Sequence, residues 1–111
     1  MVIQAGCFAE RNSDNQMVHY IAVLTVKEGK RAEYIEELKK ERLVEQFRDQ
    51  TGNVHYYITE SVDDPNVVLV SDQWETKADF DAHCSSEIVK KQWNKLYKEY
   101  VTLEKSNLYE K

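Results

Sequence analysis

The chain has 111 residues, a length that suits a single domain built around one hydrophobic core. Charged residues of both signs make up 32% of it and the net charge is −5, which argues against nucleic-acid binding, since phosphate recognition depends on clustered Lys and Arg. No apolar run approaches the roughly 20 residues that span a bilayer, and two widely spaced cysteines do not make a disulfide framework. We therefore expect a cytoplasmic protein without a membrane partner.

The first regular element is expected after an irregular lead-in. The stretch 9–16 is polar and rich in turn-forming side chains, so residues 1–17 are predicted to be this lead-in, and residues 18–111 are predicted to form one domain. In the segment 19–26, apolar residues occupy both alternating faces and several are β-branched. This pattern predicts a central strand that is covered on both sides.

The segment 31–50 has a helical composition, but its apolar side chains do not stay on one face. In the first half, the apolar side chains lie on the face that contains Leu38. In the second half, they lie on nearly the opposite face, which contains Phe47. Two interpretations are open. The helix bends near Lys40, or its second half contacts a different surface, of which a partner subunit is one example. Gly52 then marks the end of the helix.

The remainder of the chain continues the alternation of strands and helices. Two strands are predicted over 53–62 and 67–74, joined by a turn that contains Pro65. Thr76 is expected to cap a short helix, and an amphipathic helix and a weaker strand follow. The order β-α-β-β-α-β predicts an α+β fold of the ferredoxin-like type, an antiparallel sheet with helices on one face. The other face keeps apolar side chains, which predicts a homodimer.

The segment 73–83, Gln-Trp-Glu-Thr-Lys-Ala-Asp-Phe-Asp-Ala-His, is the most specific stretch of the chain. It resembles the Trp-Glu-Ser-x-x-Ala-Leu-x-x-His signature of antibiotic-biosynthesis-monooxygenase domains. Shorter matches in the same order extend the resemblance over residues 19–105, among them Val-Lys-Glu-Gly at 26–29 and Thr-Gly-Asn-Val-His-Tyr at 51–56. The resemblance implies a dimeric α/β barrel of two ferredoxin-like sheets packed face to face. It also implies a pocket between the sheet and the helices of each protomer.

The same resemblance implies a class of activity. Some members oxidise polycyclic phenols or quinols with molecular oxygen, without a metal or a flavin, because an electron-rich phenolate can itself pass an electron to oxygen. Such a protein needs a dry cavity and a base or hydrogen-bond partner for the phenol. Other proteins of this fold degrade haem with an Asn, a Trp and a His. The corresponding positions here are Ala22, His83 and Trp93, which disfavours that activity.

His83 is the residue for which a catalytic role is predicted first. It is expected on the same side of its helix as Phe80, so its imidazole could accept a phenolic proton near neutral pH. The structural alternative is a hydrogen bond that closes the helix junction. Phe80 and four more residues are predicted to form the substrate pocket, with the core or a partly solvated sheet face as the alternative for the four: Trp74, Tyr57, His55 and Trp93.

No metal-ligand spacing and no glycine-rich nucleotide loop is recognisable in the sequence, so neither a metal nor a cofactor is predicted. The leading hypothesis is a cofactor-independent monooxygenase that acts on a small aromatic ligand, a phenol or quinol. The alternative is a non-catalytic ligand-binding or stress-response module on the same fold. An isomerase of small phosphorylated carbonyl compounds ranks last, since the sequence offers no cationic cluster for the phosphate.

Overall fold

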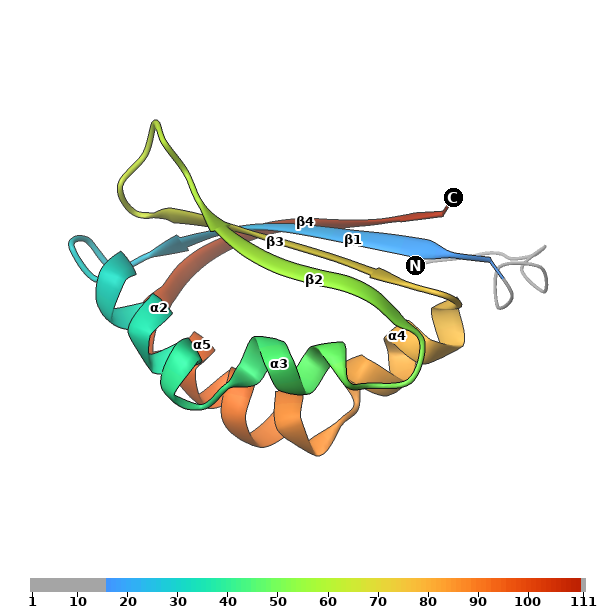
Figure 1. Ribbon diagram of the computed structural model, residues 1–111. Coiled ribbons are helices and arrows are strands. Elements are labelled where there is room, and N and C mark those ends of the chain that lie inside the picture. Colours follow the sequence, from blue (N-terminus) through green and yellow to red (C-terminus); the bar gives the residue numbers. More distant parts are fainter. Residues whose placement is uncertain (1–15, 111) are drawn as a thin grey trace.

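The computed structural model describes residues 16–110; the predicted lead-in, apart from its last two residues, lies outside them. A four-stranded antiparallel sheet with the strand order β2-β3-β1-β4 carries helices on one face only (Figure 1). This confirms the predicted α+β, ferredoxin-like fold. The elements are β1 (Val18–Val26), α2 (Arg31–Lys40), α3 (Leu43–Arg48), β2 (Asn53–Glu60), β3 (Val67–Trp74), α4 (Lys77–Cys84), the π-helical segment η1 (Ile88–Trp93), α5 (Asn94–Tyr100) and β4 (Val101–Glu110).

Strand alternation separates the two faces of the sheet. In β3 every second side chain is buried toward the helices, and β1 pairs with β3 in the register that sets Ala22 opposite Val70. The helices cover this inner face, and the hydrophobic core lies between the two layers. The outer face carries no element of the described chain, and Val23 in the central strand is 38% exposed there. Thus β1, predicted to be covered on both sides, is covered on one side within the protomer.

The predicted helix over 31–50 is two helices, because Arg42 has a left-handed backbone conformation with φ 54°. This break ends α2 and redirects the chain, so that Leu43 and Phe47 of α3 are fully buried in the same core as Leu38 of α2. The bend predicted near Lys40 is therefore confirmed. The second apolar face contacts the chain's own sheet and helices, which leaves no reason to assign it to a partner subunit.

The start of α4 follows its sequence signature. The Oγ1 atom of Thr76 accepts a hydrogen bond of 3.1 Å from the backbone N–H of Asp79, as predicted for a capping residue. Ser86 begins the next helical segment, where its Oγ accepts a bond from the N–H of Val89. No helix within residues 16–110 is both long and apolar enough to cross a membrane.

Gly52 joins α3 to β2, and its backbone conformation would strain any other residue at this position. Its φ is +82°, and a Cβ there would overlap the carboxylate side chain of Asp79. Its carbonyl oxygen accepts a 2.7 Å hydrogen bond from the N–H of Glu75, which ties the start of β2 to the end of β3. Gly29 has a similar φ of +76° but faces open space.

We expect Gly52→Ala to lower the free energy of unfolding by about 2–3 kcal/mol, because it adds steric overlap to the cost of a left-handed backbone. The matched variant Gly29→Ala meets only the backbone cost and should lose about 1 kcal/mol. Chemical denaturation followed by circular dichroism measures both values. Equal losses in the two variants would contradict the role assigned to the Gly52–Asp79 approach.

Candidate functional site

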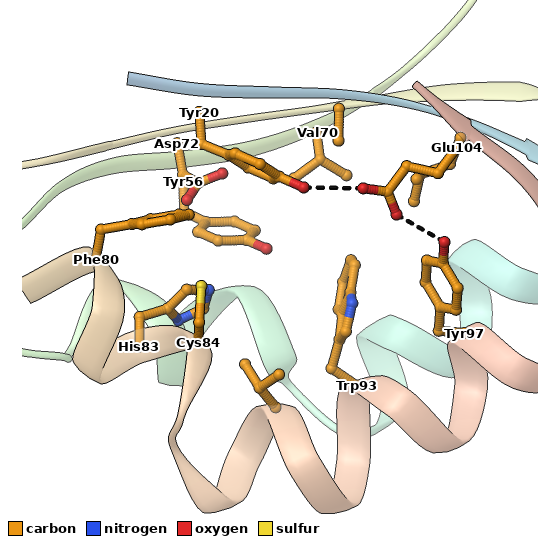
Figure 2. A pocket seen from close by; sticks show the side chains of 13 residues that line it. Tyr20, Tyr56, Val70, Asp72, Phe80, His83, Cys84, Trp93, Tyr97 and Glu104 are labelled. Atoms are coloured by element: carbon orange, nitrogen blue, oxygen red, sulfur yellow. Dashed lines mark hydrogen bonds between the residues drawn. The ribbon is translucent and has the colours of Figure 1, made fainter. Parts of the chain in front are cut away.

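A cavity of about 120 Å³ lies between the inner face of the sheet and the helices (Figure 2). Strand alternation brings side chains of all four strands to its upper wall, and α4, η1 and α5 form the opposite wall. Cys84, at the end of α4, lines the cavity and is also exposed to solvent, so the cavity opens to the surface there. The lining residues are Tyr20, Ala22, Leu24, Tyr56, Val70, Asp72, Phe80, His83, Cys84, Val89, Trp93, Tyr97 and Glu104.

His83 lies at one end of this cavity with its ring enclosed by aromatic side chains. It is only 8% exposed and stacks on Trp74 with a centroid distance of 4.6 Å. Its Nδ1 lies 2.7 Å from Oε1 of Gln50, and since an amide oxygen only accepts, Nδ1 carries the proton and Nε2 of the neutral ring is an acceptor. Burial lowers the pKa of His83 to about 4, so the imidazole is neutral at physiological pH.

Asp72 is the most buried polar side chain in the cavity wall, with 1% exposure. The indole N–H of Trp74 donates a 2.7 Å hydrogen bond to Oδ2, whereas Oδ1 has no hydrogen-bond partner within the described chain. Burial raises the pKa of Asp72 to about 6, and the hydrogen bond from Trp74, which lowers the pKa, offsets only part of this rise. The carboxyl group is therefore ionised at pH 7 and is a stronger base than an exposed aspartate.

Glu104 of β4 provides a second carboxyl group at the other end of the cavity (Figure 2). Tyr20 donates a 3.0 Å hydrogen bond to its Oε2, and Tyr97 donates a 2.6 Å bond to its Oε1. Burial alone would raise the pKa of Glu104, but the hydrogen bonds from Tyr97, Ser106 and Tyr20 together lower it. Unlike Asp72, this carboxylate has its charge satisfied by the protein itself.

The structure separates the residues that the sequence analysis assigned to one pocket. His83, Phe80 and Trp93 line the cavity, as proposed. Trp74 is fully buried behind His83 and holds Asp72 instead of facing the cavity. His55 and Tyr57 lie apart from the cavity, on the outer face of the sheet, because the inward positions of β2 are those of Tyr56 and Ile58.

Five polar residues of the cavity were not foreseen from the sequence: Tyr20, Tyr56, Asp72, Tyr97 and Glu104. Asp72 did carry a signal, because it occupies an inward position of β3 between two apolar ones, where a carboxylate needs a specific reason to be buried. Glu104 carried none, since β4 is mostly polar and exposed. Within residues 16–110 no group of three or more His, Cys, Asp or Glu side chains could hold a metal ion.

The fold and the site define a class of protein: a ferredoxin-like α+β domain with an aromatic-lined cavity between its sheet and its helices. The family model for antibiotic biosynthesis monooxygenases matches residues 17–94, which is more than half of the chain. The chain belongs to the antibiotic biosynthesis monooxygenase family, as the resemblance of the segment 73–83 indicated.

Solved structures share this fold. A protein from Shewanella oneidensis has a TM-score of 0.78 at 25% sequence identity, over 87% of this chain and 92% of that one. A conserved protein from Methanosarcina mazei Go1 has a TM-score of 0.76 at 21% identity, over 90% and 97%. SnoaB, described as a cofactor-independent oxygenase from Streptomyces nogalater, has a TM-score of 0.71 at 18% identity, over 85% and 91%. The last two show the fold alone. No curated protein gives a significant match to this chain.

The two titrating groups of the cavity have opposite effects on stability between about pH 4 and pH 6. The folded pKa of Asp72 is about 6 against 3.8 for an ordinary Asp, so its contribution to stability is present at low pH and lost as the pH rises through 6. The folded pKa of His83 is about 4 against 6.5, so its contribution is present at high pH and lost as the pH falls through 4. In the natural chain the two contributions largely cancel.

We therefore expect Asp72→Asn to unmask the acid sensitivity of His83. Relative to the natural chain, its free energy of unfolding should fall by about 1 kcal/mol per pH unit on acidification from about pH 6 to about pH 4. At pH 7 the variant should be more stable by about 1–3 kcal/mol, because no buried charge is left unpaired. Urea denaturation across this pH range measures the difference. Asp63→Asn, the same change at an exposed turn, should run parallel to the natural chain, and a parallel profile for Asp72→Asn would contradict the assignment.

Proposed function

We propose that the protein is a cofactor-independent monooxygenase that oxidises an aromatic phenol or quinol with molecular oxygen. The observation that carries the proposal is the cavity itself, which combines aromatic and aliphatic walls with buried carboxyl and imidazole groups. Membership of the antibiotic biosynthesis monooxygenase family supports it, as does the shared fold with SnoaB, a protein described as a cofactor-independent oxygenase.

The chemistry requires little from the protein beyond this environment. Loss of the phenolic proton leaves an electron-rich phenolate, which passes one electron to oxygen; the two radicals then combine to form a C–O bond. Loss of water leaves a carbonyl group, so one oxygen atom enters the organic product, the other becomes water, and all electrons come from the substrate. A buried acceptor for the proton and exclusion of bulk water favour the first step.

The charges of the cavity disfavour a phosphorylated substrate. Of the thirteen residues that line it, none is Lys or Arg, and two, Asp72 and Glu104, are acidic. A phosphate group in this space would be desolvated beside carboxylates without a cation to compensate it. The isomerase hypothesis therefore has no support from the site, whereas a neutral phenol is compatible with it.

Narrowing the cavity should stop oxygen uptake without altering its polar groups. Val89 lines the cavity from η1, so Val89→Phe should fill much of the space and lower the rate of oxygen consumption with hydroquinone by about tenfold or more. An oxygen electrode, with a chelator present and the rate without protein subtracted, measures this effect. Val62→Phe makes the same change at a loop position that is 99% exposed and should leave the rate unchanged.

Two outcomes would count against a monooxygenase. If the natural protein does not increase the rate of oxygen uptake with any single-ring or two-ring phenol, the monooxygenase is ruled out and the ligand-binding module remains. Equal activity of Val89→Phe and Val62→Phe would show that the reaction takes place outside this cavity.

The second part of the proposal is a homodimer formed by the outer face of the sheet. Large apolar side chains of three strands are exposed on this face, although it has no cover within the described chain. Burial of such a face between two copies would remove it from water, and self-association through one surface gives a twofold dimer. The exposed apolar side chains at outward positions are Val23, Tyr57, Leu103 and Tyr109.

A charge in the centre of this face should abolish the dimer. Val23 lies in the central strand β1, so Val23→Glu would bury an unpaired carboxylate in the interface of a dimer. Light scattering should give twice the chain mass of 13.1 kDa for the natural protein and 13.1 kDa for the variant. Val62→Glu, in the exposed loop, should remain dimeric. A natural chain that is monomeric at micromolar concentration would overturn this part of the proposal.

A further inference from the structure

One buried polar atom in the cavity wall has no hydrogen-bond partner among residues 16–110. Three buried side-chain atoms of the described chain lack a hydrogen bond: the Tyr34 hydroxyl, Nδ1 of His55 and Oδ1 of Asp72. Of these three residues, Asp72 alone lines the cavity. Leaving a buried acceptor unpaired costs about 1–3 kcal/mol, and more when it is charged. A ligand that donates a hydrogen bond to this atom would remove that cost.

The carboxyl group of Asp72 is held in one orientation. The indole N–H of Trp74 engages Oδ2, and because Trp74 is itself fully buried, this bond fixes the plane of the carboxyl group. Figure 2 shows the group beside the rings of Tyr20 and Tyr56, on the sheet side of the cavity and across from His83. Trp74 is thus a positioning residue, and Oδ1 is the atom that remains available.

Neighbouring ionisable groups do not compete for this role near neutral pH. Burial raises the pKa of Tyr20 to about 12 and that of Cys84 to about 11, and burial raises the pKa of Tyr56 well above its usual value. All three are therefore neutral. Glu104 is ionised, but its two carboxylate oxygens already accept bonds from tyrosine hydroxyl groups.

Charge conservation favours Asp72 over His83 as the acceptor of a phenolic proton. Transfer from a phenol to His83 would turn two neutral groups into an imidazolium and a phenolate. Burial already disfavours the imidazolium, as the lowered pKa of His83 shows. Transfer to an ionised Asp72 moves one negative charge from the carboxylate to the phenolate and creates no additional charge. The second process needs far less solvation from the cavity.

The size of the cavity restricts the ligand. Cavities of about 150 Å³ accept one benzene ring in an apolar protein interior, and this one has about 120 Å³. One aromatic ring therefore takes up the space inside the cavity, whereas a fused second ring would have to extend through the opening at Cys84. The two carboxyl groups in the wall also exclude ligands that carry a carboxylate or a phosphate.

We propose that Oδ1 of Asp72 receives the hydroxyl group of an uncharged, single-ring phenol and takes its proton. The O–H bond of the phenol breaks, its electron pair stays on the phenolate oxygen, and the proton forms a new O–H bond on the carboxylate. The proton transfer rests on the proposed monooxygenase function, but the binding of the phenol to Asp72 does not. Asp72 thereby replaces His83 as the predicted base.

Calorimetric titration with two isosteric probes tests the binding part. In para-nitrotoluene a methyl group takes the place of the hydroxyl group of para-nitrophenol, so the ratio of their dissociation constants at pH 6.5 isolates the contribution of the hydroxyl. A charge-assisted hydrogen bond predicts a preference of about tenfold or more for the phenol in the natural chain. In Asp72→Asn the amide oxygen still accepts from Trp74, and the NH₂ group that faces the ligand can only donate to the phenol oxygen. The charge-assisted bond is lost, so the preference should fall to about threefold or less, the contribution of a neutral hydrogen bond.

His83→Asn is the matched control, because it changes the opposite wall and keeps Asp72. It should retain the preference for para-nitrophenol. A preference that survives in Asp72→Asn, or one that is lost in His83→Asn instead, would overturn the assignment of Asp72. If neither probe binds the natural chain, or if a two-ring naphthol binds better than para-nitrophenol, the single-ring ligand is wrong.

Oxygen uptake with hydroquinone tests the proton transfer separately. Loss of the base should lower the rate of Asp72→Asn by about a hundredfold or more, while binding of para-nitrotoluene stays the same. An unchanged rate in this variant would refute the transfer to Asp72. If the natural chain consumes no oxygen but shows the Asp72-dependent preference, the monooxygenase function fails and the phenol-binding site stands.

Discussion

A single sheet has two faces, and the described part of this chain supplies helices for only one of them. Everything else in the structure depends on this asymmetry. The core and the cavity must share the space beneath the inner face, so the cavity is small and two of its polar side chains, Asp72 and His83, are buried. The outer face keeps exposed apolar side chains, such as Leu103 and Tyr109, which is the basis for the proposed dimer.

Within the cavity, packing and electrostatics are linked through the pair formed by Asp72 and Trp74. The indole ring stacks on His83 of α4 and donates the one hydrogen bond that the carboxyl group receives within residues 16–110. The same burial keeps the imidazole neutral and the carboxyl group unusually basic. The proposed oxidation of a phenol requires both properties, because the proton must leave in a medium that does not solvate charge.

The sequence was a good guide to the elements and a partial guide to the site. The strand over residues 67–74 and the cap at Thr76 could be predicted because each depends on local sequence and geometry. The site prediction found His83 from a sequence signature, but it grouped His55 with the pocket because polarity does not reveal which face of a strand points inward. Asp72 was passed over, although a carboxylate among the apolar residues of an inward-facing row is itself informative.

By itself, the sequence determined the order of strands and helices, the two-sided pattern of the sheet and the membership of the family, since all of these follow from short-range periodicity and short motifs. The tertiary structure decided three further matters. It placed the left-handed turn at Arg42, which sends α3 back into the core, and it assigned each strand face to the helices or to the outside. It also brought Asp72 and Glu104, which lie on different strands, into the wall of one cavity. Contacts between residues of different strands depend on strand register and on packing across the sheet, and no local sequence pattern encodes them.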